Sequence, residues 1–472
     1  MLFNSYVFPV FFLITYLLYR ILPHRGQNLM LLVASYVFYG WWNWIFLSLI
    51  AISTVIDYVC GIGIHKAVSD RWRRGFLAVS MCGNLGMLGF FKYYDFFAQS
   101  LSDALSSVGF NPELLRLEIL LPVGISFYTF QTMSYTIDIY RREMKPTRNF
   151  FDFALFVSFF PQLVAGPIER ASRLLPQVTA KRSVTWEKTK SGLALIAFGY
   201  FKKLFVADNM AVIVNQIFEM EPSNLNVWYV TLGAYAFAFQ IYGDFSGYSN
   251  IARGISRLLG FELMVNFRAP YLVKNPAMFW RHWHISLSSW LRDYLYISLG
   301  GNRLGKWRTK LNLFLTMVLG GLWHGAAWNF VWWGIYQGGL LMAFRSRAKK
   351  GEEDAAQRHI HVTDVLKWIA TFQLICLGWL IFRAESGAQL WAMLRGLGTW
   401  AQPTGEIGMR FLSLIFFCWF LVWEQYDKVR RGHEIAFADR SPRWKFAVYA
   451  YLLFCATFMA AETQQEFIYF QF

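Results

Sequence analysis

Residues 311–341 read LNLFLTMVLGGLWHGAAWNFVWWGIYQGGLL, and apart from the imidazole of His324 this stretch carries no acidic or basic side chain. A membrane helix needs about 20 consecutive, mostly apolar residues. The stretch is longer than one such helix, and the glycines around His324 mark a place where it can turn. It therefore predicts two apolar helices, over residues 311–324 and 326–344, in a chain embedded in a membrane.

The composition of the whole chain supports a membrane protein. Of its 472 residues, 56% are hydrophobic and only 16% are charged, whereas a soluble domain carries about 25% charged residues. The 21 Trp and 46 Phe residues present more aromatic surface than a soluble interior can bury, and lipid offers a second apolar environment. The five cysteines form no CxxC pair, which argues against a disulfide framework.

Further apolar stretches predict an all-α integral membrane protein. Together with the two helices above they indicate about 11 transmembrane helices in a single domain over residues 1–472. Residues 152–168 and 278–300 mix apolar and charged side chains, which is typical of re-entrant or interfacial helices around a polar interior. The other candidate spans are 3–19, 29–41, 44–63, 76–94, 119–140, 192–218, 228–249, 365–383, 409–426 and 446–461.

The charge distribution predicts an orientation in the membrane. The net charge is +16, and Lys and Arg gather in short loops, whereas the connections 95–118 and 219–227 carry almost none. Under the positive-inside rule the basic loops are cytoplasmic, so the N-terminus and the C-terminal residues 462–472 are extracytoplasmic. No basic face or reader motif for nucleic acid is visible, so we expect no nucleic-acid partner; membrane lipid is the partner of the apolar surface.

His324 is the first candidate for chemistry, because an ionisable side chain is costly to keep inside a membrane. It lies in LGGLWHGAA, residues 319–327, and glycine lets a backbone or a ligand approach closely. A neutral imidazole in this position can accept a proton from a hydroxyl or a thiol. The alternative interpretation is a structural histidine bonded to a neighbouring carbonyl.

The second candidate is the polar, Trp-rich stretch FWRHWHISLSSWLRDY, residues 279–294. On a helix, His284 shares one face with Ser288 and with Arg281, so we expect these side chains to line a funnel that leads in from the cytoplasm. His282 and His284 resemble a metal-binding pair, but no third ligand stands at a familiar spacing, and no metal is expected.

Asp244 is the third candidate. It lies in QIYGDFSGYSN, residues 240–250, at the end of an apolar span and among hydroxyl and amide side chains. Its carboxylate can orient a histidine or cap the end of a helix. The sequence leaves both roles open.

Taken together, these stretches resemble the membrane-bound O-acyltransferase family, in the bacterial branch typified by the membrane subunit of alginate O-acetylation. The resemblance covers nearly the whole chain, and it depends on the ordered set of motifs and not on any one of them. The motifs are LPVGISFYTF at 121–130, PQLVAGPIER at 161–170, DFSGYS at 244–249, WRHWHISLSSWLRDY at 280–294, GGNR at 300–303 and LWHG at 322–325.

The resemblance implies a ring of helices around a central tunnel, which an acyl thioester enters from the cytoplasm and an acceptor enters from the other side. It assigns the invariant histidine of the family to His324 and the second polar position to His284. His282 stands where relatives often have arginine, which concerns the entrance for the acyl donor. The family implies an enzyme of the bacterial inner membrane that O-acetylates an extracytoplasmic exopolysaccharide such as alginate or cellulose.

These residues suggest general-base catalysis. His324 would remove the proton from an acceptor hydroxyl as its oxygen attacks the thioester carbonyl of acetyl-CoA, the expected co-substrate, and His284 would stabilise the oxyanion. Asp244, Ser288 and Trp323 are expected to support the two histidines. The phosphates of CoA need cations, and the expected cytoplasmic mouth offers Arg281, Arg292, Arg303 and Lys306.

Two functions from other classes are alternatives. A membrane transporter or flippase of acyl or lipid-linked intermediates would use the histidines as proton relays. It predicts inverted repeats, and the sequence shows no sign of them. A non-catalytic scaffold that recruits polysaccharide-modifying enzymes leaves the pair of His284 and His324 unexplained.

The chain ends on an aromatic cluster, EFIYFQF, residues 466–472. One interpretation is an interfacial aromatic belt, which commonly flanks membrane helices. A second is a dock, anchored by Phe470 and Phe472, for a separate extracytoplasmic acetyltransferase that passes the acetyl group to the polymer. In a third, the tail folds back and places Tyr469 against His324 as a transient acyl carrier.

Overall fold

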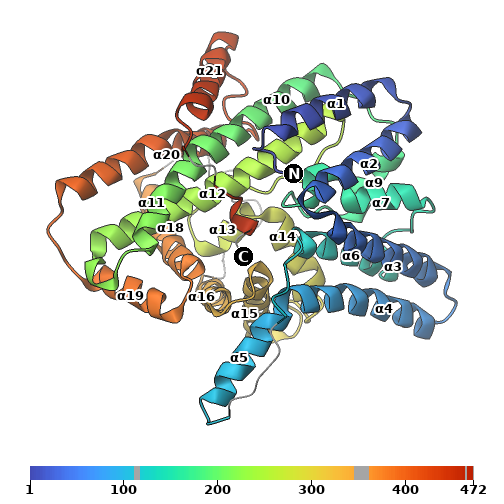
Figure 1. The fold of residues 1–472 in the computed structure, drawn as a ribbon, viewed down its shortest axis with the longest axis horizontal. Coiled ribbons are helices and arrows are strands. Elements are labelled where there is room, and N and C mark those ends of the chain that lie inside the picture. Colours follow the sequence, from blue (N-terminus) through green and yellow to red (C-terminus); the bar gives the residue numbers. More distant parts are fainter. Residues whose placement is uncertain (111–116, 345–360, 463–464, 471–472) are drawn as a thin grey trace. The chain divides into compact units, whose positions relative to one another are not determined.

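The computed structural model describes residues 1–110, 117–344, 361–462 and 465–470, with the backbone alone at Tyr469. Within these ranges the chain is helical and has no β-strand (Figure 1), which confirms the predicted all-α class. The chain divides into two compact units, one of Met1–Gly192 with Ile255–Met264, and one of Leu193–Gly254 with Val265–Phe472. That the two act as one membrane domain stays a prediction.

In the first unit, polar side chains cap the starts of η1, α4 and α7. Asn43 accepts a hydrogen bond from the backbone of Ile45, and Ser69 accepts one from the backbone of Trp72. Such caps satisfy N–H groups that have no partner inside the helix. The helices are α1 (Val7–Ile21), α2 (His24–Asn43), η1 (Trp44–Phe46), α3 (Leu47–Lys66), α4 (Asp70–Leu88), the π-helix η2 (Gly89–Tyr93), α5 (Tyr94–Ser106), α6 (Ile125–Tyr140), α7 (Phe150–Ser158), α8 (Phe160–Leu163) and α9 (Ala171–Thr179).

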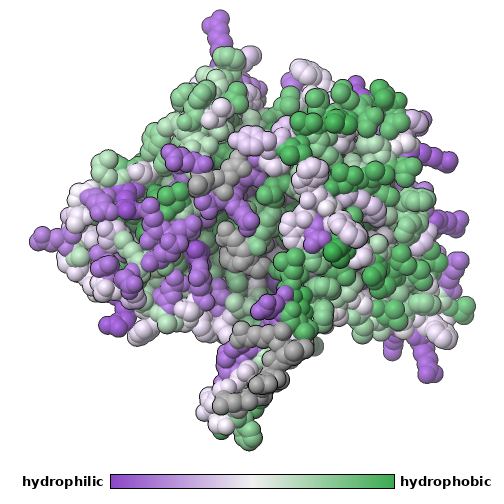
Figure 2. Space-filling model, viewed as in Figure 1, coloured by the Kyte–Doolittle hydropathy of each residue, from purple (hydrophilic) through white to green (hydrophobic). Residues whose placement is uncertain are grey.

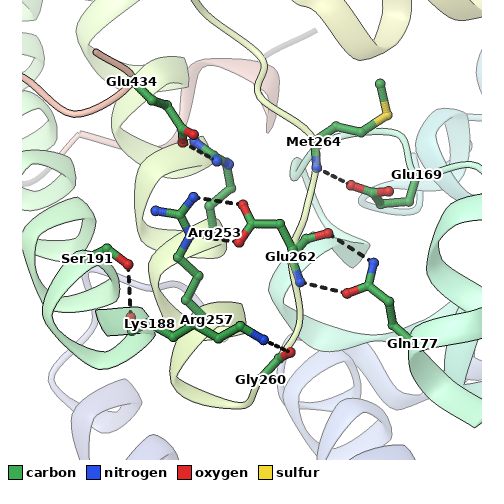
Figure 3. Close-up of polar contacts among 10 residues, drawn as sticks. All are labelled: Glu169, Gln177, Lys188, Ser191, Arg253, Arg257, Gly260, Glu262, Met264 and Glu434. Carbon is green, nitrogen blue, oxygen red and sulfur yellow. Dashed lines mark hydrogen bonds and ion pairs between the residues drawn. The ribbon is translucent and has the colours of Figure 1, made fainter. Parts of the chain in front are cut away.

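Residues 255–264 return to the first unit, and polar contacts tie them to it (Figure 3). Arg257 donates two hydrogen bonds of 2.8 Å to the carboxylate of Glu262. The backbone N–H of Glu262 donates to the side chain of Gln177 at 2.7 Å. The charge-assisted, bidentate pair lies within the return segment and fixes its shape, and the bonds between Glu262 and Gln177 hold the segment against α9.

The second unit is built around large aromatic side chains, and Trp283, Trp333 and Trp379 are among its fully buried residues. Its longest helix, α12 (Val227–Leu258), ends in the first unit. Helix α10 (Trp186–Tyr200) begins in the first unit and continues into the second. The other helices are the π-helix η3 (Phe201–Ala207), α11 (Asp208–Phe218), η4 (Pro222–Asn224), α13 (Pro276–His282), α14 (Ile285–Trp290), the π-helix η5 (Leu291–Tyr296), α15 (Gly305–His324), α16 (Trp328–Ala343), α18 (Val362–Arg383), α19 (Gly387–Gly398), α20 (Gly405–Arg431), α21 (Pro442–Phe458) and η7 (Ile468–Phe470).

The outer surface is apolar over wide areas, as Figure 2 shows for one face. On α20, for example, Leu412, Phe416 and Trp419 are all exposed. Exposed apolar surface of this extent indicates contact with lipid, and the chain is an integral membrane protein. Among the described residues, four helical stretches are long and apolar enough to cross a membrane: His24–Lys66, Asp70–Ser106, Val362–Arg383 and Gly405–Arg431. The count of about 11 transmembrane helices stays a prediction.

The observed helices refine the predicted spans. The two apolar helices predicted on either side of Gly325 are confirmed as α15 and α16. The span predicted at 228–249 is only part of α12, which continues to Leu258. The segment predicted at 278–300 is broken into α13, α14 and η5, which agrees with its mixed apolar and polar composition.

Candidate active site

Helices α15 and α16 form a tight hairpin that holds His324. A Cβ atom on Gly321 would overlap the carbonyl oxygen of Phe330 and lie 3.0 Å from the Cα atom of Gly334. At Gly325, a Cβ atom would overlap the ring of Phe330. Only glycine permits backbones to approach this closely. The glycines around His324 therefore pack one helix against the other and fix the imidazole in the last turn of α15.

His284 lies where a helix breaks. Helix α13 ends at His282, Trp283 is extended, and His284 takes a left-handed conformation with φ 42° and ψ 55° before α14 begins. The prediction that Arg281 and His284 share a helix face is therefore wrong. Ser288 lies one turn beyond His284, but its hydroxyl donates to the carbonyl of Trp283 at 3.1 Å.

Asn266 holds this left-handed turn in place. Its carbonyl accepts from the N–H of Ile285 at 3.0 Å, and its side-chain oxygen accepts from the N–H of Ser286 at 3.2 Å. The amide of Asn266 donates in turn to the hydroxyl of Ser249 on α12 at 3.2 Å. These bonds fix the two residues that follow His284 and offset the strain of a left-handed residue that has a β-carbon.

The two candidate histidines lie close to each other in the interior of the second unit. Their ring centroids are 6.5 Å apart, and His284 is 0% and His324 5% exposed. This separation is too long for a hydrogen bond between the rings, but one small polar group between them can contact both. The structure thus brings together the two residues that the sequence singled out.

Aromatic rings surround both imidazoles, at centroid distances between 4.5 and 6.1 Å. An aromatic wall keeps water out, and charge–dipole interactions are stronger where water is absent. The rings are Phe245 and Trp323 around His284, and Trp323, Trp333 and Phe382 around His324.

The environment of His284 favours a neutral ring. Burial lowers the pKa of this imidazole well below its usual range, and the neighbouring His324 lowers it further. A neutral imidazole has one N–H donor and one acceptor nitrogen. His284, in the connection between α13 and α14, can therefore donate one hydrogen bond to a developing negative charge.

The predicted binding residues for CoA lie at the surface of the second unit. Arg292 donates to Asp293 at 2.7 Å, so part of its charge is already compensated. Arg303 lies in the turn before α15 and Lys306 in the first turn of that helix. All four predicted cations are exposed: Arg281, Arg292, Arg303 and Lys306.

The metal alternative finds no candidate in the part of the chain that the structure describes, because no group of three or more His, Cys, Asp and Glu side chains is placed to hold an ion. The ring of His282 contacts the carbonyl oxygen of Arg268. The carbonyl of His282 accepts in turn from the N–H of Arg268 at 3.0 Å. His282 therefore holds the end of α13 against the connection that precedes it.

Asp244 lies in the middle of α12, so it does not cap the end of that helix. Its carboxylate lies 2.9 Å from Nζ of Lys203 and accepts from the N–H of Ile468 at 2.6 Å. Lys203 also pairs with Asp208 at 2.9 Å. Neither Lys203 nor Asp208 belongs to the predicted site. A lysine inside the apolar span 192–218 is nevertheless a signal of function, because such groups are costly in a membrane.

The C-terminal segment packs into the second unit, where η7 carries the end of the described chain (Figure 1). Phe467 is 4% and Ile468 1% exposed. The ring of Phe467 lies 4.9 Å from that of Tyr248 and 5.5 Å from that of Phe470. Burial this complete does not fit an aromatic belt at the membrane surface, so that interpretation is wrong for these residues.

The other two interpretations of the tail stay predictions. Phe472, one proposed anchor of a docked partner, lies outside the described residues. The side chain of Tyr469 does so too, although its backbone belongs to η7.

A comparison of the sequence with models of protein families identifies the family of this protein. The model of the membrane-bound O-acyltransferase family matches residues 140–383, a range that includes both histidines. The chain belongs to this family. It is accordingly an acyltransferase, which favours an enzyme over the transporter and scaffold alternatives.

Similar proteins place the chain in the branch of this O-acyltransferase family that the sequence motifs indicated. The probable alginate O-acetylase AlgI of Pseudomonas aeruginosa is 42% identical over 446 residues, 91% of this chain and 83% of the relative. That of Azotobacter vinelandii is 44% identical over 410 residues, 85% of this chain and 79% of the relative. The peptidoglycan O-acetyltransferase of Helicobacter pylori is 35% identical over 433 residues, 84% of this chain and 80% of the relative.

Proposed function

We propose that this O-acyltransferase moves an acetyl group from cytoplasmic acetyl-CoA, across the bacterial inner membrane, to a hydroxyl of an extracytoplasmic polysaccharide. The observation that carries the proposal is the pair of buried imidazoles 6.5 Å apart in a chain of this family. The names of the relatives specify alginate and peptidoglycan, both of which are built from sugars. Alginate, cellulose or a similar exopolysaccharide is therefore the acceptor class.

In the proposed reaction His324 is the general base. It takes the proton of an acceptor hydroxyl while the oxygen forms a bond to the thioester carbonyl carbon. The N–H of His284 stabilises the oxyanion until the carbon–sulfur bond breaks, and the CoA thiolate takes the proton back from His324. A general base typically contributes about 10²–10⁴-fold and one oxyanion donor about 10²–10³-fold.

The proposed scheme also assigns roles to the exposed cations, to Tyr469 and to a partner protein. Arg281, Arg303 and Lys306, which are exposed, hold the phosphates of CoA. The hydroxyl of Tyr469 is the first acceptor, so that an acyl ester on the tail carries the group onward. A separate extracytoplasmic acetyltransferase takes it from there to the polymer.

The substitution His324→Ala tests the proposal. We expect acetyl transfer from acetyl-CoA to fall by at least about 10²-fold, because the acceptor hydroxyl loses its general base. His284→Ala should be slower than the wild type but keep residual activity. Transfer is measured with labelled acetyl-CoA on purified protein in lipid nanodiscs.

The matched control is His65→Ala, because His65 is an exposed histidine in the last turn of α3 with no role in the scheme. It should transfer at the wild-type rate. Turnover close to the wild type in His324→Ala, in protein of unchanged thermal midpoint, would rule out the proposed base.

The orientation is tested with single-cysteine labelling from either side of the membrane. Labels at Arg73, Arg148, Lys181 and Lys306 should react from the cytoplasmic side, and a label at Asn224 from outside, as the positive-inside rule requires. A cytoplasmic C-terminus would contradict the proposed direction of transfer.

A further inference from the structure

A buried charge cluster lies apart from the two histidines in the second unit. It consists of Lys203, Asp208 and Asp244, which are 6%, 2% and 3% exposed. Nζ of Lys203 lies 2.9 Å from each carboxylate. Two carboxylates face one ammonium, and a buried charge is costly unless it is paired and hydrogen-bonded. The cluster therefore needs further hydrogen-bond donors.

The C-terminal segment supplies them from its main chain. The N–H of Ile468 donates to Asp244 at 2.6 Å, and the backbone of Gln465 bonds Asp208. The carbonyl of Gln465 accepts from Lys203 at 3.0 Å. Each charged group of the cluster thus binds a backbone atom of the tail. The cluster therefore fixes the path of the tail backbone, independently of the side chains that the tail carries.

An aromatic contact connects the same segment to the candidate active site. The ring of Phe467 lies 6.2 Å from that of Phe245. Phe245 follows Asp244 on α12, and its ring meets His284 at 4.5 Å. The tail is therefore held one aromatic side chain away from a candidate catalytic imidazole.

The helices that carry the cluster are themselves held rigidly. A Cβ atom on Gly247 of α12 would lie 2.8 Å from the carbonyl oxygen of Gly199, and one on Gly243 would lie 3.0 Å from that of Lys202. Lys203 lies on the π-helix η3, a rare form that is frequent at functional sites. This close crossing sets Lys203 opposite Asp244 before the tail adds its bonds.

We propose that Lys203, Asp208 and Asp244 are positioning residues that clamp the C-terminal segment by its main chain beside His284. The proposal rests on the proposed function, because it assigns the clamp to the step in which the tail takes part. The three residues act through the tail. Without these three residues, segment 465–470 detaches from its position beside His284. The acyl transfer in which this segment takes part then becomes slower.

Hydrogen exchange of the full-length protein in lipid nanodiscs tests the clamp directly. In Lys203→Met and in Asp244→Leu, the amides of residues 465–470 should exchange at least about tenfold faster, because each change removes a charge-assisted contact to the tail. Exchange in α18 should not change. Lys203→Arg keeps the positive charge and should restore much of the protection.

The matched control is Lys190→Met, because Lys190 lies on α10, pairs with Glu187 at 2.6 Å and is exposed at the surface. Its tail should exchange as in the wild type. Unchanged exchange of the tail in both Lys203→Met and Asp244→Leu would overturn the proposal.

Kinetics separate the clamp from the chemistry. In Lys203→Met the kcat for transfer to polymer should fall at least about tenfold while the KM for acetyl-CoA stays unchanged, because a released tail loses its effective concentration at the site. A released tail with wild-type kcat would overturn the positioning role. His324→Ala and Tyr469→Phe should lose transfer with the tail still protected, so a failure of the proposed chemistry is distinguishable from a failure of the clamp.

Discussion

Each unit of the protein buries carboxylates among its helices, and Asp57 and Asp244, one from each unit, are satisfied in different ways. In the first unit, Asp57 on α3 accepts from the hydroxyl of Ser80 and, at 2.8 Å, from the amide of Asn84. In the second unit, Asp244 on α12 faces Lys203 and a backbone N–H that lies 224 positions further along the chain.

The difference lies in which part of the chain supplies the partners. Around Asp57 they come from neighbouring helices: Ser53 donates to Asn84 at 2.8 Å, and Ser80 lies 2.9 Å from Thr136 on α6. This network opens only if α3, α4 and α6 separate. Asp244 has Lys203 on η3 as one partner, and its other partner is the segment 465–470 beyond α21, which can detach while the long helices stay in place. We therefore predict that Asp57 serves stability and that Asp244 serves the proposed transfer step.

The largest effect on stability should come from Asp57→Ala. It leaves the buried donors of Ser80 and Asn84 without their acceptor, and each such loss costs about 1–3 kcal/mol. We expect the free energy of unfolding to fall by about 2–4 kcal/mol while kcat per folded molecule stays at the wild-type value. Thermal unfolding in detergent, followed by an activity assay on the folded fraction, measures both. A loss of kcat at full stability would make the two carboxylates alike and break the comparison.

Lys203→Met should lower kcat strongly and the free energy of unfolding only slightly, which is the opposite of Asp57→Ala. The tail can leave and admit water to Asp208 and Asp244, so the cost of two unpaired carboxylates is avoided. Transfer should fall about tenfold or more, with a thermal midpoint closer to the wild type than that of Asp57→Ala. Collapse of the whole fold in Lys203→Met would show that this cluster, too, is structural.

The same conservative substitution at both carboxylates should give the smallest effects. Asp57→Asn keeps the size and one acceptor, so it should lose about 1 kcal/mol of stability. Asp244→Asn keeps a carbonyl oxygen for the N–H of Ile468, so its tail should exchange faster than in the wild type but slower than in Asp244→Leu. Equal exchange in the asparagine and leucine variants would show that the charge holds the tail and that the acceptor does not.

Local patterns explain how much of this arrangement is predictable. The two apolar helices around Gly325 follow from residues that are neighbours in sequence, and so does the choice of His284 and His324, because ionisable groups stand out in an apolar stretch. The break before His284 does not follow, since the helical spacing of Arg281 and His284 says nothing of the left-handed turn that Asn266 stabilises.

The tail and its clamp depend on contacts over more than two hundred residues. Hydrophobic periodicity predicts each helix separately, and it does not indicate which distant segment of the chain binds a buried polar group. Lys203, Asp208 and Asp57 all stand inside predicted apolar spans, and treating each as an expected member of a buried pair would have pointed to both clusters. Their partners would still have required the structure.

The left-handed backbone of His284 has a consequence for protein engineering. A residue with a β-carbon in this conformation loses about 1–2 kcal/mol relative to glycine, so a search for thermostable variants is drawn towards glycine or asparagine at this position. Such a variant gains heat resistance by discarding an imidazole that lies 6.5 Å from His324. Libraries selected for survival at high temperature alone would therefore lose activity while gaining stability, and turnover has to be screened alongside stability.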